Sequence, residues 1–277
     1  MPDTLNHQRN AGLGIAVAAL LLAGPAHAVE TIRIGGTGIG LATARSLGDR
    51  LEQLSADLKV EVLPSLGTPG GIEALADGAI DVAIAGRPLK PEEQKKGLHE
   101  ASCMTTALVF AKSHPKPPSI DLAGVPDYYT SSAATWPDGT PMRVILRSRA
   151  GSENPYLARV IPGMGQALEA AYRRGGIPVG ATDQENVDIA QRTPGSLTVS
   201  TMMQLVTEHV NLRIVPVNGV SPSPRTLEDG SYPFPLRICL VTRGQGPAGA
   251  VRFIEFTNSA RGQEILRGYD ILPLGRP

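Results

Sequence analysis

Three short polar turns contain the residues of this chain that are best suited to hold a small anion. They span residues 35–41, 65–72 and 147–154, and each comes directly before a predicted helix. The start of a helix presents unpaired N–H groups and the positive end of the helix dipole, and both attract negative charge. Further donors lie in the same turns, on Thr68, Ser148, Ser152 and either Arg147 or Arg149. These residue types predict reversible capture of an oxyanion.

Each turn by itself also fits a simpler interpretation. Small polar residues commonly begin the helices of an α/β protein, and their hydroxyl groups then cap the first backbone N–H groups. Three such turns in one exported, two-lobed chain favour ligand binding, because ligands occupy the crevice at the ends of the strands in such sheets.

The sequence offers little support for catalysis. The Gly-rich turn at residues 35–40 is similar to a dinucleotide fingerprint, and taken alone it resembles the start of a short-chain dehydrogenase. The sequence lacks the Tyr followed four residues later by Lys that such an enzyme needs, and it has no Gly-x-Ser-x-Gly turn of a hydrolase. His99, His114 and His209 are scattered and have no metal-ligand spacing. We expect no enzyme activity, no metal and no cofactor; the alternative is an exported NAD(P)-dependent oxidoreductase.

Repeated units of strand, turn and helix position these turns. Strands are predicted at residues 31–34, 60–63, 80–85, 142–146 and 236–242, and helices at 41–58, 72–76, 156–174, 248–256 and 261–268. The first helix carries leucines at three- and four-residue steps with one longer step, and the third helix is interrupted near Pro162 and Gly163. The repeat predicts a parallel sheet with crossover helices.

Two Pro-rich segments divide the chain. The first lies at residues 112–127 and the second at residues 221–235, where Pro and Gly cluster again. Two crossings mean that the C-terminal segment returns to the first lobe. We therefore expect one lobe from residues 29–112 plus 234–277 and a second from residues 113–233.

Composition and the N-terminus point to an exported, soluble receptor. An apolar run rich in Ala and Leu precedes the small residues Ala26 and Ala28, which is typical of a secretory signal peptide cleaved after residue 28. The run is shorter than the roughly 20 residues that a membrane span needs. The remaining chain carries 25 basic and 25 acidic residues, so no general field draws it to nucleic acid. These features predict a periplasmic protein.

Cys103 and Cys239 both remain after cleavage, and each lies in an apolar run that reads as a strand. In an oxidising compartment a disulfide between them and two separate buried thiols are equally compatible with their spacing.

The order of the motifs resembles the phosphate-type periplasmic binding proteins of ABC uptake systems. Residues 67–72 are similar to that family's Gly-Ser-x-Gly-Gly segment, and residues 78–89 are similar to its Asp-Phe-Gly-Ala-Ser-Asp strand. Residues 122–139 resemble the segment after the first hinge, residues 218–233 the return crossing, and residues 262–265 the closing helix. The resemblance implies an α/β, two-lobed periplasmic binding protein fold of type II, in which each lobe is a mixed sheet flanked by helices and two strands form the hinge.

The resemblance also implies positions for the ligand-binding residues. The family's Ser in the second turn falls on Thr68, which keeps the hydroxyl group, and its first-turn Thr and Phe fall on Gly40 and Leu41. Its second-lobe Arg, Ser, Gly and Thr fall around Arg147, Ser152, Glu153 and Asn154, with an offset of one residue for the Arg.

One position departs from the family's pattern. The Asp that accepts the proton of hydrogen phosphate falls on Gly86. Such a carboxylate selects a ligand that carries a proton over a fully ionised one, so its loss weakens that discrimination. Glu153 either replaces this acceptor from the opposite lobe or pairs with a neighbouring arginine.

We therefore expect a monomeric receptor that closes on phosphate or a related oxyanion and, as the resemblance implies, delivers it to the permease of an ABC importer. The alternative on the same fold is a sensor or adhesion module. The expected ligand-binding residues are Gly38, Ile39, Gly40, Leu41, Thr68, Gly70, Gly86, Arg87, Arg147, Ser148, Gly151, Ser152, Glu153 and Asn154.

Overall fold

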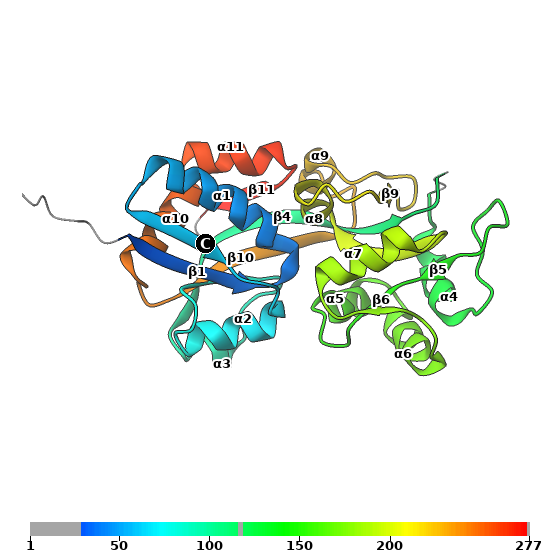
Figure 1. Ribbon diagram of the computed structural model, residues 1–277. Helices are drawn as coiled ribbons and strands as arrows, with labels where there is room; N and C mark the ends of the chain where they lie inside the picture. Colours follow the sequence, from blue (N-terminus) through cyan, green and yellow to red (C-terminus); the bar gives the residue numbers. More distant parts are fainter. Residues whose placement is uncertain (1–28, 116–118, 276–277) are drawn as a thin grey trace, which may run out of the picture.

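The protein folds into two lobes that are joined by long strands (Figure 1). The computed structural model describes residues 29–115 and 119–275. The expected signal peptide, residues 1–28, lies outside the described residues. The α/β two-lobed architecture predicted from the sequence is confirmed.

The first half of the chain builds alternating strands and helices. These elements are β1 (Glu30–Gly36), the 3-10 turn η1 (Gly38–Gly40), α1 (Leu41–Leu54), β2 (Leu58–Val62), α2 (Gly67–Ala76), β3 (Val82–Ala85), α3 (Pro91–Gln94) and β4 (Leu98–Lys112). Strands β1 and β2 are parallel, and β3 pairs in parallel with β1 on its other side. Parallel pairing with crossover helices is therefore present as predicted, but the sheet as a whole is mixed, because the strand at residues 235–243 pairs antiparallel with β3 and β4.

The middle of the chain builds shorter elements. They are η2 (Leu122–Gly124), α4 (Val125–Thr130), β5 (Arg143–Val144), β6 (Leu146–Arg147), α5 (Glu153–Val160), α6 (Met164–Arg174), β7 (Val179–Gly180), α7 (Asp183–Arg192), β8 (Ser196–Thr201), α8 (Met202–Thr207), β9 (Arg213–Val215) and α9 (Pro224–Glu228). The last part adds β10 (Pro235–Arg243), α10 (Ala248–Asn258), α11 (Ala260–Gly268) and β11 (Leu272–Gly275).

Strand β4 belongs to both lobes. The large sheet has the order β2-β1-β3-β10-β4-β8-β5, and β9 and β11 also pair with β4. The first part of β4 pairs antiparallel with β10, whereas Leu108 to Lys112 pair with β8 and β9. In Figure 1, β4 and β10 run from one lobe toward the other. The change of partner along one continuous strand links the two lobes.

Helices cover both faces of the sheet in the first lobe. Leu47 and Leu51 of α1 are buried against the core that α10 also covers, as expected from the leucine spacing in this helix. Ile72 and Leu75 of α2 belong to a separate core on the other face, with Leu98 of β4. Strand β3 is buried along its whole length because both faces are covered.

Three local expectations need correction. Residues 67–71 were expected to form a turn before a helix at Ile72, but α2 already begins at Gly67. The first helix ends at Leu54 instead of residue 58, where β2 begins. The sequence patterns also left α7 and β8 unassigned. The predicted interruption near Pro162 is confirmed, because α5 ends at Val160 and α6 begins at Met164.

Candidate functional site

A small cavity lies where the polar turns of the two lobes meet. Its volume is about 210 Å³. It is lined by Thr37, Ser65, Leu66, Gly67, Thr68, Pro69, Arg147, Ser148, Ala150, Gly151, Ser152, Glu153, Ala181, Thr182 and Asp183. The structure thus brings residues of all three predicted turns together, and it adds a fourth segment that begins α7.

Helix α2 contributes its N-terminus to the cavity. Gly67 has a φ of +66°, which glycine adopts without strain, and Leu66 at the N-cap provides no side-chain cap. The first N–H groups of a helix have no partner within the helix, so they are available to a ligand at this end. Thr68 stands in the first turn and is 2% exposed.

The Thr68 hydroxyl is hydrogen-bonded to Gly86, the residue that follows β3. Its Oγ1 accepts a hydrogen bond from the backbone N–H of Gly86 at 3.0 Å. A hydroxyl group that accepts one hydrogen bond still has its own hydrogen to donate. Thr68 is therefore both a structural acceptor and a candidate donor to a ligand.

The absence of a side chain at Gly86 lets the second lobe approach. A Cβ atom at this position would lie 3.2 Å from Oγ of Ser152 and 3.5 Å from Oγ1 of Thr68. The space next to Gly86 is thus bounded by hydroxyl groups from both lobes. A Cβ atom at this position would therefore press slightly on Ser152 and make ordinary contact with Thr68.

Arg147 is held between two carboxylates. Its Nε lies 2.7 Å from Oε1 of Glu153, and its Nη2 lies 3.0 Å from Oδ1 of Asp183. Its Nη1 donates to the carbonyl oxygen of Gly180 at 3.0 Å. The three side chains are at most 12% exposed. Among the described residues that line the cavity, Arg147 is the only Lys or Arg, so two negative groups face one positive group.

Burial raises the pKa of the Glu153 carboxyl above its ordinary value of 4.5. The charge of Arg147 opposes this effect, and the negative charge of Asp183 adds to it. Although the Glu153 Oε1 and Arg147 Nε atoms are close, neither has an aligned hydrogen-bond partner among the described residues. Glu153 therefore holds a proton more readily than an exposed glutamate.

Asp183 connects the second lobe to the first turn of the first lobe. Its Oδ2 lies 3.4 Å from Oγ1 of Thr37, which donates to it. The neighbouring Gln184 donates from Nε2 to the carbonyl oxygen of Gly38 at 3.0 Å. Both contacts cross between the lobes.

Sequence reasoning missed Asp183, although a signal for its location was present. Thr182 and Glu185 have the spacing of a capping box, which marks the start of a helix. In the structure the backbone N–H of Glu185 donates to Oγ1 of Thr182, and the Glu185 carboxylate accepts from the N–H of Ala181. This pattern places Asp183 in the first turn of α7.

Several predicted site residues do not line the cavity. Ile39 and Leu41 are buried in the core, and Gly40 packs against Ile84. The Arg87 guanidinium forms an ion pair with Glu93 at 2.6 Å. The remaining members of this group are Gly38, Gly70, Gly86 and Asn154.

Two of these residues have clear structural roles. Gly38 contacts the second lobe through its carbonyl oxygen, as described above. The Asn154 amide donates to the carbonyl oxygen of Ser148 and to the hydroxyl of Tyr172, both at 2.9 Å. Asn154 therefore supports the third turn from within its lobe.

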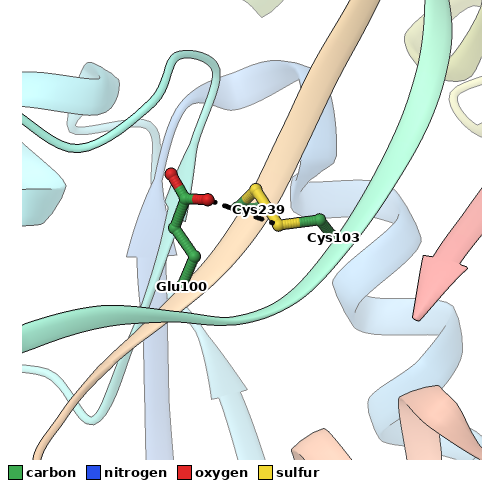
Figure 2. A group of neighbouring side chains, drawn as sticks. All are labelled: Glu100, Cys103 and Cys239. Atoms are coloured by element: carbon green, nitrogen blue, oxygen red, sulfur yellow. Dashed lines mark hydrogen bonds between the residues drawn. A yellow bond between two sulfur atoms is a disulfide. The ribbon is translucent and has the colours of Figure 1, made fainter. Parts of the chain in front are cut away.

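Cys103 and Cys239 form a disulfide, which decides the question that their spacing left open. They are directly opposite each other on β4 and β10. Glu100 lies next to them (Figure 2). One carboxylate oxygen of Glu100 and the two sulfur atoms lie within 4.8 Å of one another, which is close enough for three metal ligands. With the sulfur atoms bonded to each other, this group is a cross-link and is not a metal site.

A larger hollow of about 510 Å³ lies elsewhere, between β4, β10 and α10. It shares no lining residue with the cavity between the turns. The cavity between the lobes remains the stronger candidate, because donors from two lobes converge only there among the described cavities. None of the described helices has the length and apolar character needed to cross a membrane.

The fold and the inter-lobe cavity define a two-lobed binding protein, and comparison with known proteins agrees. The sequence profile of the PBP superfamily domain matches residues 23–261, so the chain belongs to this family. This is a family of binding proteins, and the resemblance inferred from the motifs is confirmed at this level. Comparison with curated proteins gives no match.

Similar solved structures support the fold. One is a putative phosphate ABC transporter substrate-binding protein with bound phosphate from Clostridium perfringens, with 17% identity, a TM-score of 0.75, and coverage of 88% of this chain and 100% of that chain. An ABC-type phosphate transport receptor from Vibrio cholerae has 14% identity, a TM-score of 0.61, and coverage of 88% and 100%. The periplasmic molybdate-binding protein of Azotobacter vinelandii has 12% identity, a TM-score of 0.58, and coverage of 87% and 98%. At these identities the likeness concerns the fold.

Proposed function

We propose that this protein is a periplasmic solute-binding protein that captures phosphate or a related oxyanion and delivers it to the permease of an ABC importer. The inter-lobe cavity is the observation that carries the proposal. Helices α2 and α5 both begin at this cavity without a side-chain cap, and Thr68, Ser152 and Arg147 lie beside these ends. Backbone N–H groups at the start of α2, hydroxyl groups and a guanidinium are the kinds of donor that an oxyanion needs. At the start of α5 the Asn154 N–H already donates to the carbonyl oxygen of Gly151, so Ser152 is the main donor there.

We further propose that the ligand is bound by closure of two lobes, residues 29–112 plus 234–277 and residues 113–233. The hinge then consists of β4 near Leu108 and of the segment that enters β10 at Pro235, because the partner strands of β4 change there. The contacts of Asp183 and Gln184 with the first lobe describe a closed arrangement. We expect the mature chain to act as a monomer.

Calorimetric titration of residues 29–277 tests the proposal. The protein is titrated separately with phosphate, sulfate, molybdate and a phosphonate, and with NAD as a control. We expect heat of binding with at least one oxyanion and none with NAD. Absence of binding to every oxyanion over the range from acidic to mildly alkaline pH would contradict the proposal.

A further inference from the structure

Three side chains with atoms that bind soft metal ions meet on one face of the first-lobe sheet. Cys103 and Cys239 are opposite each other on β4 and β10, so their side chains emerge on the same face. The Oε2 atom of Glu100 lies 3.7 Å from Sγ of Cys103. Figure 2 shows the Glu100 carboxylate directed at the sulfur atoms. Two sulfur atoms and one oxygen atom therefore form a compact group.

An irregularity in the strand pairing brings Glu100 to this face. Side chains of a regular strand alternate between the two faces, so residues three positions apart point to opposite sides. The register between β4 and β10 shifts between Leu240 and Val241, because Ala101 has no direct partner on β10. An extra residue of this kind reverses the alternation beyond it. Glu100 and Cys103 consequently lie on the same side of the sheet.

A positive charge already lies on two of these atoms. Nη2 of Arg237 is 2.8 Å from Oε2 of Glu100 and 3.1 Å from Sγ of Cys103. The side chain of Arg237 is 40% exposed and that of Glu100 is 15% exposed, whereas both cysteines are buried. The group therefore holds a cation on its outer side, and a metal ion can reach it from there when the guanidinium moves into solvent.

The spacing suits a tetrahedral metal ion once the two sulfur atoms are separate. Zinc lies about 2.3 Å from a thiolate sulfur and about 2.0 Å from a carboxylate oxygen, so a sulfur and an oxygen ligand of one ion are about 3.5 Å apart. The separation of 3.7 Å between Cys103 and Glu100 is close to this value. Thiolate ligands select zinc and related soft ions over magnesium and calcium, which prefer oxygen ligands.

We propose that reduction of the Cys103–Cys239 disulfide creates a binding site for a thiophilic divalent cation of the class of Zn²⁺, with both thiolates and the Glu100 carboxylate as ligands. A dithiol reductant supplies two electrons and two protons. The bond between the two sulfur atoms breaks, the dithiol closes to its own disulfide, and each cysteine becomes a thiol. The metal ion then displaces the two thiol protons into water.

The metal ion thus replaces the disulfide as the link between β4 and β10. The oxidised protein has no such site, because its sulfur atoms are bonded to each other. None of the three ligand residues lines the cavity between the lobes, so the inference is independent of the proposed function.

A metal titration of residues 29–277 tests the inference. The disulfide is first reduced without oxygen by a water-soluble phosphine, which becomes the phosphine oxide. Cd²⁺ is the probe, because cadmium–thiolate bonds give a charge-transfer absorption in the ultraviolet. We expect this band to saturate at one ion per chain in the reduced protein, to be absent from the oxidised protein, and to disappear when Zn²⁺ competes.

Two results of this titration would overturn the inference. One is the absence of the band when a thiol assay shows that both cysteines are free. The other is failure of the phosphine to reduce the disulfide while the chain is folded, as followed by circular dichroism.

Thermal melting distinguishes a site of the folded protein from capture of metal by an unfolded chain. Reduction is expected to lower the melting temperature, and Zn²⁺ is expected to raise it again, because a ligand that prefers the folded state stabilises that state. A melting temperature of the reduced protein that Zn²⁺ lowers or leaves unchanged would contradict a folded site.

The Glu100→Gln variant tests the oxygen ligand. Loss of a group that only supports a ligand typically weakens metal binding about 10- to 100-fold, so loss of a direct ligand should weaken Cd²⁺ binding at least about tenfold. Glu61→Gln is the matched control, because Glu61 is a half-exposed carboxylate of β2 in the same sheet. Equal affinities of the two variants would overturn the role of Glu100. The comparison of reduced with oxidised wild type decides the matter even if Glu100→Gln does not fold.

Discussion

Gly86 affects the cavity in two ways: its N–H group fixes the Thr68 hydroxyl, and its missing side chain leaves room for Ser152. The Gly86 N–H binds the Thr68 hydroxyl, and the space that a side chain at position 86 would fill is bordered by Ser152. The resemblance places an acidic residue at position 86, whereas in the structure the carboxylates next to the cavity are Glu153 and Asp183, and both pair with Arg147.

Thr68→Val is expected to weaken anion affinity by about 1 to 3 kcal/mol, because a donor to a charged group is lost. The same change removes the partner of the buried Gly86 N–H, so a lower melting temperature is also expected. Thr68→Ser keeps the hydroxyl group and is the control. Calorimetry with phosphate measures the affinity, and equal affinity in the Val variant would limit Thr68 to its structural bond.

Glu153→Gln is expected to flatten the pH dependence of stability. Burial raises the pKa of Glu153 in the folded state above 4.5, so the folded state binds more protons than the unfolded state just above that pH. The contribution of Glu153 to the free energy of unfolding therefore falls as pH rises from about 4.5 through the folded-state pKa. Denaturant titrations at several pH values measure the difference. Glu169 is half-exposed, so the Glu169→Gln variant should keep the wild-type dependence of the free energy of unfolding on pH.

At the scale of the elements, the N-termini of the helices position most of the polar residues of the cavity. Helix α2 begins at Gly67 because a glycine with positive φ turns the chain directly into the helix, and α7 begins where Thr182 caps its first turn. Each start brings short polar residues to the cavity with fixed backbone geometry. The loop at Gly38 must then fit closely against α7.

Gly38→Ala is expected to hinder closure. A Cβ atom at this position would meet Oε1 of Gln184 at 2.5 Å and Oδ2 of Asp183 at 2.6 Å. Because these contacts cross between the lobes, the closed form is penalised and anion affinity should fall by about tenfold or more, with little change in melting temperature. Gly268→Ala, which meets no atom within 4 Å, is the control. Equal affinities of the two variants would show that the Gly38 contact does not govern closure.

At the scale of the whole molecule, a disulfide joins the two long strands β4 and β10. Cys103 and Cys239 are separated by 136 positions and are paired across β4 and β10. The cross-link closes a very long loop and so removes much of the freedom of the unfolded chain. It also joins the strands on the first-lobe side of the proposed hinge.

Replacing both cysteines by alanine is expected to lower the free energy of unfolding by about 2 to 5 kcal/mol. Urea denaturation of the wild type, with and without reductant, provides the comparison, and the double variant should be insensitive to reductant. A loss smaller than about 1 kcal/mol would mean that the reduced chain keeps equivalent constraints in its unfolded state.

The sequence by itself determined the repeating strand, turn and helix units, the two Pro-rich crossings and the three polar turns. Local patterns suffice for these features, because helical leucine spacing and Gly-rich turns act over a few residues. Thr68, Arg147 and Ser152 were identified in this way, and the structure places them around one cavity.

Only the tertiary structure decided how the charges of the site are shared. It brought Asp183 onto Arg147, a pairing that the capping pattern around Thr182 does not predict, and it directed Arg87 and Asn154 to other partners. It also joined the two cysteines. The physical reason is that ion pairs, burial and disulfides depend on which residues meet in space. The spacing of residues along the chain does not specify those long-range contacts.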